Sequence, residues 1–232
     1  MLKKILERHR MNVPMDIQSF KKIHCIGIGG IGIYALAKFF ALQGATVTGS
    51  DLVTNELIDE LRALGVKVSI GHTPGNVPAD AELVVHSPAI TTNNSEYLIA
   101  KEFGLEVKSY PEVLGELSKS RRTIAVTGMH GKSTTTAMIG SVLASLDPLV
   151  IVGSRVKGFS NGNLQYTQSS TSPFVVEACE YRGHMRHLSP SEIVITNIEE
   201  EHMDYYRDLA HIKETFQEFT NTLTSEGVVY VN

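Results

Sequence analysis

Short apolar runs alternate with amphipathic stretches along the first half of the chain. The apolar runs lie at residues 23–28, 46–50, 66–71, 82–87 and 105–110, and the helical patterns at about 31–42, 56–65, 95–103 and 111–120. Strands that alternate with helices are typical of βαβ units around a parallel sheet. The pattern therefore predicts a doubly wound α/β unit over residues 21–120.

The second half repeats this alternation. Strands are expected at residues 123–128, 148–154, 173–179, 192–198 and 227–232, and helices from the turn after residue 128 to about 146 and at 211–223. We place the boundary between the units in the polar, basic stretch at 119–122, so the second unit covers residues 121–232. Residues 1–20 form an extension with a short amphipathic helix. No helix follows the final predicted strand, so we expect a partial domain with a sheet face or edge uncovered.

Composition excludes several classes of protein. Hydrophobic residues make up 42% and charged residues 20% of the 232, which is ordinary for a folded globular protein. The net charge of -4 gives no general attraction to nucleic acid or to an anionic membrane, and no apolar stretch approaches the length of a membrane span. Cys25 and Cys179 lie far apart, each in an apolar run that suggests a buried strand, so we expect no disulfide and a cytoplasmic location.

Residues 127–134 read TGMHGKST and lie between an apolar strand and a helix. This is the context of a phosphate-binding loop, in which glycines turn backbone N–H groups toward an anion and the helix adds its positive dipole end. A lysine at 132 can reach the β- and γ-phosphates, and a serine hydroxyl at 133 can ligate Mg²⁺. We therefore predict an ATP site in a shortened form of the loop, formed by Gly128, Met129, His130, Gly131, Lys132, Ser133 and Thr134.

A second glycine turn, GIGGIG, occupies residues 27–32 after the first strand, and Asp51 ends the second strand about 20 residues later. By itself this pattern favours a dinucleotide such as NAD, with Asp51 on a ribose. The turn can equally hold any diphosphate at a helix N-terminus. A dehydrogenase has no use for the loop at residues 127–134, and a plain ATPase has no use for the turn at residues 27–32. The two turns together therefore indicate a nucleotide-linked substrate that reacts with ATP.

Polar side chains also follow two later strands. Glu177 comes at the carboxyl end of one strand, and Asn197 and His202 follow another. Ligands of α/β sheets gather at this edge, where Glu177 can hold Mg²⁺ and His202 a second ion. For His202 considered alone, a packing or surface role is the better interpretation. We expect the remaining acidic residues here to form a solvated rim, namely Glu180, Glu199, Glu200, Glu201 and Asp204.

The chain resembles the Mur ligases from about residue 22 to residue 232. Six segments carry the resemblance in order: HCIGIGGIG, VTGSD, TGMHGKSTTT, VVEACEY, HLSP and TNIEEEHMDYY. Within that family it looks most like the members that add L-alanine to UDP-N-acetylmuramate. The resemblance implies a Rossmann-like UDP-binding domain followed by a P-loop ATP-binding α/β domain, and an ATP- and Mg²⁺-dependent ligase of peptidoglycan synthesis that works through an acyl phosphate.

The resemblance also implies roles for individual residues. Lys132 would stabilise the transferring phosphoryl group, and Asn197 would lie close to the phosphates. Ser133 and Glu177 would bind one Mg²⁺ and His202 a second, while His130 would contact the reacting carboxylate. The UDP-linked substrate would be held by Gly27, Gly29, Gly30, Ile31, Gly32, Asp51, His72 and Ser87.

The sequence departs from the family pattern in a few places. Ser133 stands where the family usually has threonine, Glu201 where aspartate often precedes the metal-site histidine, and Cys179 where relatives often have aspartate. Family members carry a third domain that closes over ATP and holds the amino acid, so we expect no complete ligase activity from this polypeptide alone. The alternatives are a binding module for UDP-sugar and ATP without catalysis, a muropeptide-recycling or other Mur ligase, and an NAD-binding dehydrogenase.

Overall fold

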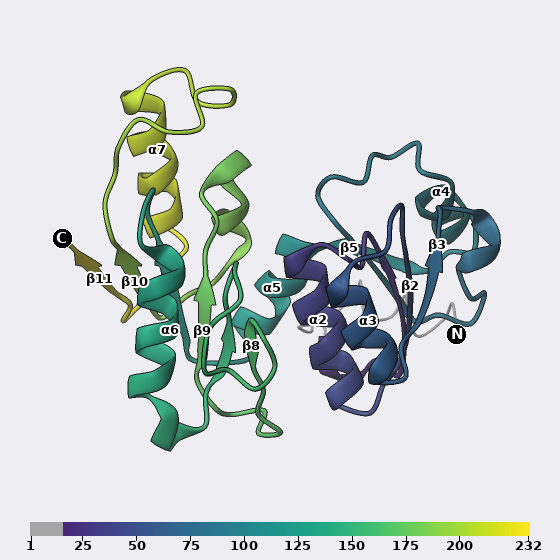
Figure 1. Cartoon of the computed structure of the whole chain (residues 1–232). Helices are drawn as coiled ribbons and strands as arrows, with labels where there is room; N and C mark the ends of the chain where they lie inside the picture. Colours follow the sequence, from purple (N-terminus) through teal and green to yellow (C-terminus); the bar gives the residue numbers. More distant parts are fainter. Residues whose placement is uncertain (1–15) are drawn as a thin grey trace.

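The computed structural model describes residues 16–232, which form two parallel sheets, one from each half of the chain (Figure 1). The amphipathic helix predicted at residues 1–10 lies outside the described residues. None of the helices in the described part is long and apolar enough to span a bilayer. The α/β class predicted from the alternation of strands and helices is confirmed, with Rossmann-like units in both halves.

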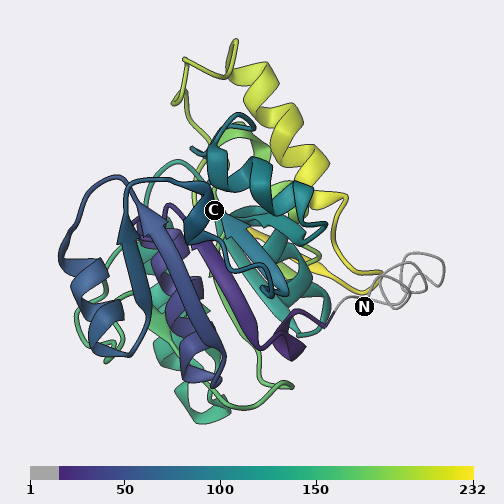
Figure 2. The ribbon, with the colours of Figure 1, turned by 90° about the vertical axis from the view of Figure 1, so that its right-hand side faces the viewer.

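The first sheet has the strand order β3-β2-β1-β4-β5, and all its neighbours are parallel. Figure 2 shows these strands side by side. From β1 the chain adds β2 and then β3 on one side, and it then crosses to the other side of β1 to add β4 and β5. The order in which strands are added therefore reverses between β1 and β4, while all the strands stay parallel. The strands are β1 (Lys22–Ile26), β2 (Thr46–Asp51), β3 (Lys67–Ile70), β4 (Leu83–His86) and β5 (Glu106–Ser109), and the helices are η1 (Ile17–Ser19), α2 (Ile31–Leu42), α3 (Glu56–Ala63), η2 (Pro74–Asn76), α4 (Ser95–Glu102) and α5 (Tyr110–Lys119).

The second sheet has the order β11-β10-β6-β9-β7-β8, in which only β8 is antiparallel to its neighbour among the described strands. All five residues of the central strand β6 are buried, as expected for a parallel sheet covered on both faces. The elements are β6 (Thr123–Thr127), α6 (Lys132–Val142), η3 (Ala144–Leu146), β7 (Leu149–Ile151), β8 (Leu164–Gln165), β9 (Phe174–Glu177), η4 (Tyr181–His187), β10 (Glu192–Ile195), α7 (Leu209–Thr220) and β11 (Val228–Val231).

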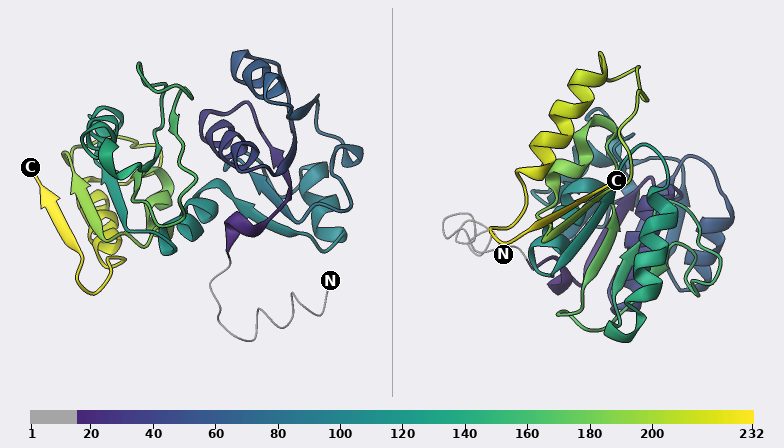
Figure 3. Two further views of the ribbon diagram at one scale, coloured as in Figure 1. Left: turned by 90° about the horizontal axis from the view of Figure 1, so that it is seen from below. Right: turned by 90° about the vertical axis from the view of Figure 1, so that its left-hand side faces the viewer.

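The two units contact each other where the segment around β8 meets α2. The amide of the fully buried Asn163 donates to the carbonyl of Ile31 at 3.0 Å, and the Tyr166 hydroxyl donates to the carbonyl of Leu42 at 3.2 Å. Helix α5 lies between the two lobes in the view from below (Figure 3). Since Ile31 begins the helix after the first glycine turn, this contact fixes that turn relative to the second unit.

A groove lies beside α6 in the second unit. Helix α6 and the strands next to it border a groove of about 540 Å³, lined by apolar side chains that include Met138, Val142 and Tyr230. These three side chains are exposed, and β11 lies at the outer edge of the sheet (Figure 3). The second sheet therefore has an exposed edge at β11.

The expectation for the two cysteines is only half right. Cys25 is buried in β1, where desolvation raises its pKa to about 12. Cys179 is exposed, because β9 ends at Glu177 and the chain turns into η4 instead of continuing as a buried strand. Both thiols are free.

Candidate functional site

The phosphate loop connects β6 to α6 and depends on two glycines. Gly128 has φ +133°, and a Cβ there would collide with the Thr196 hydroxyl and stand 3.0 Å from the backbone N of Asn197. Gly131 has φ +79° and caps the helix that begins at Lys132. The loop therefore runs directly against the end of β10, and the helix N-terminus faces the carboxyl edge of the sheet, where an anion binds well.

Asn197 holds the loop through its side chain. Its Oδ1 accepts the N–H groups of Met129 at 3.0 Å and His130 at 2.9 Å, and its Nδ2 donates to the His130 carbonyl at 3.1 Å. The Thr196 hydroxyl donates to the same carbonyl at 2.6 Å. The structure thus places Asn197 against the loop backbone, where it fixes the direction of two amides.

The Lys132 ammonium has all three protons engaged. It donates to the carbonyls of Gly128 at 2.7 Å and Met129 at 2.9 Å, and to Oε1 of Glu180 at 3.1 Å. An ammonium has three donors and no acceptor, so a phosphate oxygen can bind Lys132 only if one of these contacts is given up. The lysine is thus held across the mouth of the loop.

Ser133 and Glu177 are brought together as the sequence predicts. The Ser133 hydroxyl donates to Oε2 of Glu177 at 2.8 Å, and the N–H of Gly153 donates to the same oxygen at 2.7 Å. A hydroxyl and one carboxylate fit Mg²⁺, which keeps several waters and takes other ligands from substrate phosphates. Residues 16–232 contain no cluster of three or more His, Cys, Asp or Glu that could hold a metal ion.

His202 lies beside Glu180 rather than Glu177. Its Nε2 is 3.1 Å from Oε1 of Glu180, the oxygen that also accepts from Lys132. Glu180 is only 1% exposed, and its second oxygen, Oε2, is buried without a hydrogen-bond partner among the described residues. The prediction that Glu180 belongs to a solvated rim is therefore wrong, because its carboxylate turns inward to pair with Lys132, whereas Glu199, Glu200 and Asp204 are exposed.

The remaining predicted loop residues have different environments. The Met129 side chain is buried in the core, so only its backbone faces the loop. His130 is exposed, with its ring nitrogens 3.9 Å from carboxylate oxygens of Glu199 and Glu201. Thr134 is exposed on the first turn of α6. His130 and Thr134 are therefore accessible to a ligand at the mouth of the loop.

The first glycine turn follows β1 and leads into α2. The N–H groups of Gly27 and Ile28 donate to the Ser50 carbonyl at 2.9 and 3.0 Å, and the N–H of Gly29 donates to Oδ2 of Asp51 at 2.8 Å. Gly30 is the N-cap of α2. These contacts place the turn at the carboxyl edge of the sheet, at the point between β1 and β4 where the strand order reverses, which is the usual ligand position in such folds.

The other predicted substrate residues lie at the same edge. Ser87 directly follows β4, and its Cβ would stand 3.0 Å from a Cβ on Gly27. His72 follows β3, and its Nδ1 is 2.9 Å from the Ser50 hydroxyl. Asp51 uses one oxygen for Gly29 and the other for the N–H of Leu52 at 2.7 Å. Asp51 therefore shapes the turn, and Ser87 and His72 flank it on either side.

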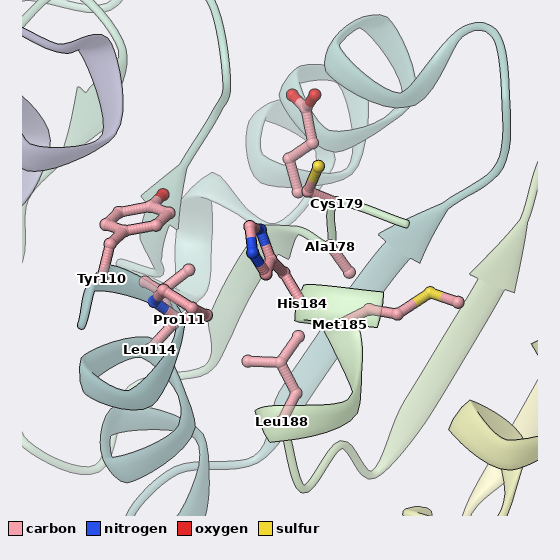
Figure 4. A pocket seen from close by; sticks show the side chains of 9 residues that line it. Tyr110, Pro111, Leu114, Ala178, Cys179, His184, Met185 and Leu188 are labelled. Carbon is pink, nitrogen blue, oxygen red and sulfur yellow. The ribbon is translucent and has the colours of Figure 1, made fainter. Parts of the chain in front are cut away.

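Tyr110 connects the two sites, and the sequence did not single it out. A Cβ on Gly32 would stand 2.9 Å from the Tyr110 ring, so this ring packs against the start of α2. Tyr110 also borders a cavity of about 30 Å³ next to Glu177, Cys179 and His184 (Figure 4). Burial, followed by the charge of Glu177, raises the pKa of the tyrosine, and burial lowers the pKa of His184. Tyr110 thus packs against the start of α2 and lines the same cavity as Glu177.

Two family models match the chain. The Mur ligase family catalytic domain matches residues 22–122, and the Mur ligase middle domain matches residues 126–232. Curated relatives named UDP-N-acetylmuramate–L-alanine ligase include those of Clostridium kluyveri and Aquifex aeolicus, each 40% identical over 218 residues, which are 93% of this chain and 47% of the relative. The chain thus spans about half the length of the curated relatives it matches.

Solved structures give the same result. The UDP-N-acetylmuramate:L-alanyl-γ-D-glutamyl-meso-diaminopimelate ligase of Neisseria meningitides aligns with a TM-score of 0.83 at 29% identity, over 92% of this chain and 72% of the other. The UDP-N-acetylmuramate–alanine ligase of Thermotoga maritima aligns with a TM-score of 0.76 at 28% identity, over 90% and 48%. With the two matched models covering both units, the chain belongs to the Mur ligase family.

Proposed function

We propose that this chain supplies the UDP-substrate site and the ATP-phosphate site of a cytoplasmic ligase that joins L-alanine to UDP-N-acetylmuramate in peptidoglycan synthesis. The observation that carries the proposal is that each unit has a glycine turn at the carboxyl edge of its sheet, and that Tyr110 packs against the helix after the first turn and lines a cavity with Glu177 of the second unit. The choice of L-alanine is supported by the names of the relatives that are about 40% identical. The chain covers 47% of such a relative, so complete turnover is proposed for a longer protein.

On the ATP side, the chain's residues bind and neutralise phosphate charge. Lys132 would exchange its contacts with the loop carbonyls for phosphate oxygens, while Asn197 holds the loop backbone in place and the N-terminus of α6 faces the same anion. Ser133 and Glu177 would hold one Mg²⁺, and His202 with Glu180 would hold a second. When bound, these ions neutralise charge that develops on the phosphoryl group.

On the substrate side, the glycine turn at residues 27–32 would hold the diphosphate of the UDP-sugar, flanked by Ser87, His72 and Asp51. The lactyl carboxylate oxygen would attack the γ-phosphorus of ATP, and the bond to the β–γ bridging oxygen would break to release ADP. The amine of L-alanine would then attack the acyl carbon of the acyl phosphate, release inorganic phosphate and lose a proton. His130, whose side chain is exposed at the mouth of the loop, would contact the carboxylate. Catalysis in this scheme comes from positioning and charge stabilisation.

A second candidate is a ligase that adds a muropeptide to the same UDP-sugar. It is favoured by the alignment with the Neisseria structure, whose TM-score of 0.83 exceeds the 0.76 of the Thermotoga alanine ligase. Both candidates use the same two sites on this chain and differ only in the amine. Turnover of a longer protein carrying this chain, with L-alanine against L-alanyl-γ-D-glutamyl-meso-diaminopimelate, would separate them.

Calorimetry with the 232-residue chain tests the binding part of the proposal. UDP-N-acetylmuramate and Mg–ATP should each bind one-to-one, whereas NAD should not bind. A variant at the turn, Gly29→Val, should abolish binding of the UDP-sugar and leave binding of Mg–ATP unchanged. The reason is that a side chain at Gly29 would crowd Asp51, Asn55 and Ile58. Binding of NAD in place of the UDP-sugar would support the dehydrogenase alternative and overturn the proposal.

A further inference from the structure

A buried polar cluster lies beneath the first glycine turn, away from the phosphate loop. Its centre is Glu96 on α4, which has no exposed surface although it carries a carboxylate. His24 of β1 and Ser50 of β2 are also completely buried. A buried carboxylate is costly unless donors satisfy it, so its contacts define what the cluster can do.

Four donors fill the acceptor positions of Glu96. Oε2 accepts from the Ser50 hydroxyl at 2.5 Å and from Nε2 of His24 at 3.4 Å. Oε1 accepts from Nδ2 of Asn76 at 2.5 Å and from the N–H of Thr73 at 3.2 Å. Burial alone would raise the pKa of Glu96, but the hydrogen bonds from His24, Ser50 and Asn76 outweigh it and lower the pKa below its ordinary value. Glu96 is thus ionised near neutral pH and acts only as an acceptor.

This charge state sets the direction of the next hydrogen bond. A serine hydroxyl has one proton, and Ser50 directs it to Glu96. The contact of 2.9 Å between the Ser50 oxygen and Nδ1 of His72 must therefore be donated by the histidine. The Nδ1 proton of His72 is therefore directed at Ser50. Its Nε2 has no hydrogen-bond partner among residues 16–232, and this atom is not fully buried.

We propose that Glu96 and Ser50 are positioning residues that hold His72 as the neutral Nδ1–H tautomer, so that Nε2 accepts a hydrogen bond from the uridine part of the substrate. His72 lies two residues after β3, whose last residue, Ile70, pairs with Asp51 at the end of β2. It is therefore beside the turn proposed to hold the diphosphate. The donor is a ribose hydroxyl or the imide N–H of the base, and the inference rests on the proposed function for the identity of the ligand.

The tautomer can be measured without any ligand. In a chain with ¹⁵N-labelled histidine, the long-range ¹H–¹⁵N spectrum distinguishes the two tautomers, and the His72 signals are those lost in His72→Gln. We expect the Nδ1–H form in the natural chain and loss of that preference in Ser50→Ala. Thr48→Ala is the matched control, since Thr48 also lies on β2 and bonds a histidine of the cluster, with its hydroxyl 2.8 Å from Nδ1 of His24.

The Thr48 variant should leave His72 unchanged. An Nε2–H or doubly protonated His72 at neutral pH, or a Ser50→Ala spectrum identical to that of the natural chain, would overturn the inference. The Thr48 control also guards against a general loosening of the cluster, because a change in both variants would show that the effect is not specific to the path through Ser50.

Calorimetry with UDP tests the role of the fixed tautomer. Ser50→Ala should weaken binding about two- to tenfold, the usual worth of one hydrogen bond, and Thr48→Ala should not. 2′-Deoxy-UDP lacks a ribose hydroxyl, and N3-methyl-UDP lacks the imide N–H. The analogue that lacks the donor recognised by Nε2 should bind the natural chain more weakly than UDP does, and in Ser50→Ala its affinity should lie closer to that of UDP. Two analogues that bind as well as UDP would overturn the acceptor role of Nε2. No binding of UDP at all would overturn the proposed function, while the spectrum still decides the positioning of His72.

Discussion

Lys132 and Glu180 form an ion pair. Variants of the two residues should show that the pair contributes to the free energy of unfolding independently of the contribution of Lys132 to nucleotide binding. The two side chains are 15% and 1% exposed, and Nζ is 3.1 Å from Oε1. In Lys132→Met the apolar side chain can fill the same space, but Glu180 keeps its charge, and His202 is its one remaining side-chain partner within residues 16–232. The perturbation therefore leaves a carboxylate buried without its lysine.

The expected magnitude follows from this burial. Removing one partner of a buried ion pair costs about 3–5 kcal/mol, and we take about 3 kcal/mol here because Lys132 retains some exposure. For a chain of this size the melting temperature should fall by roughly 6–12 °C. The matched control is Lys119→Met, since Lys119 pairs with Glu116 on the surface at 3.2 Å and its loss should cost less than about 1 kcal/mol.

Thermal unfolding followed by circular dichroism measures the stability term, and calorimetry with Mg–ATP measures binding. The double variant Lys132→Met with Glu180→Gln has no unpaired charge, so it should recover most of the stability while ATP binding stays lost. If Lys132→Met has the same melting temperature as the natural chain, the lysine is not paired as described. If the double variant stays as unstable as the single one, the cost comes from the lost contacts to the Gly128 and Met129 carbonyls instead.

Further predictions concern the loop and the buried cluster. Gly128→Ala should lower the free energy of unfolding by about 1–3 kcal/mol in melts, because φ is +133° and the space is occupied, whereas Gly131→Ala should cost less because nothing lies within 4 Å. Asn197→Ala should weaken ATP binding about tenfold in calorimetry, since two loop amides lose their acceptor. Ser133→Ala should raise the Mg²⁺ concentration needed for half-maximal ATP binding by about tenfold, or about 1.4 kcal/mol, and an unchanged requirement would remove Ser133 from the metal site. Glu96 has a pKa below its ordinary 4.5, so its stabilisation is present above that pH and lost as pH falls through the folded-state pKa; Glu96→Gln should therefore flatten the acid limb of the stability profile.

Most of the fold follows from the spacing of apolar residues. The predicted strand at 46–50 corresponds to Thr46–Asp51, and the helix expected over about 31–42 is Ile31–Leu42. The helix is long and lies between the glycine turn at residues 27–30 and Gly44, and Gly44 also marks the start of the strand, so the local pattern is sufficient here. Strand β8 was not predicted because Leu164 and Gln165 are too few for a periodic signal, and they pair only through tertiary contact with β7.

The candidate site was predictable where chemistry follows directly after a strand. Ser133 and Glu177 were expected to meet, and they do, because the phosphate loop and β9 end at the same sheet edge. Glu180 was placed wrongly, since its burial depends on Lys132, 48 residues earlier in the chain. Glu177 ends β9 and Glu180 comes three residues later, but the burial of Glu180 depends on contacts with Lys132 and His202 that the local sequence does not reveal.

Simultaneous occupancy of the two turns tests the account most directly. Native mass spectrometry of the 232-residue chain, with UDP-N-acetylmuramate and Mg–ATP present together, should detect one ternary complex that carries one copy of each ligand. Lys132→Met with Glu180→Gln should lose only the ATP adduct, and Gly29→Val only the UDP-sugar adduct. Two ligands that displace each other, or a chain that binds ATP but never the UDP-sugar, would contradict the claim that the two glycine turns serve two substrates of one ligase.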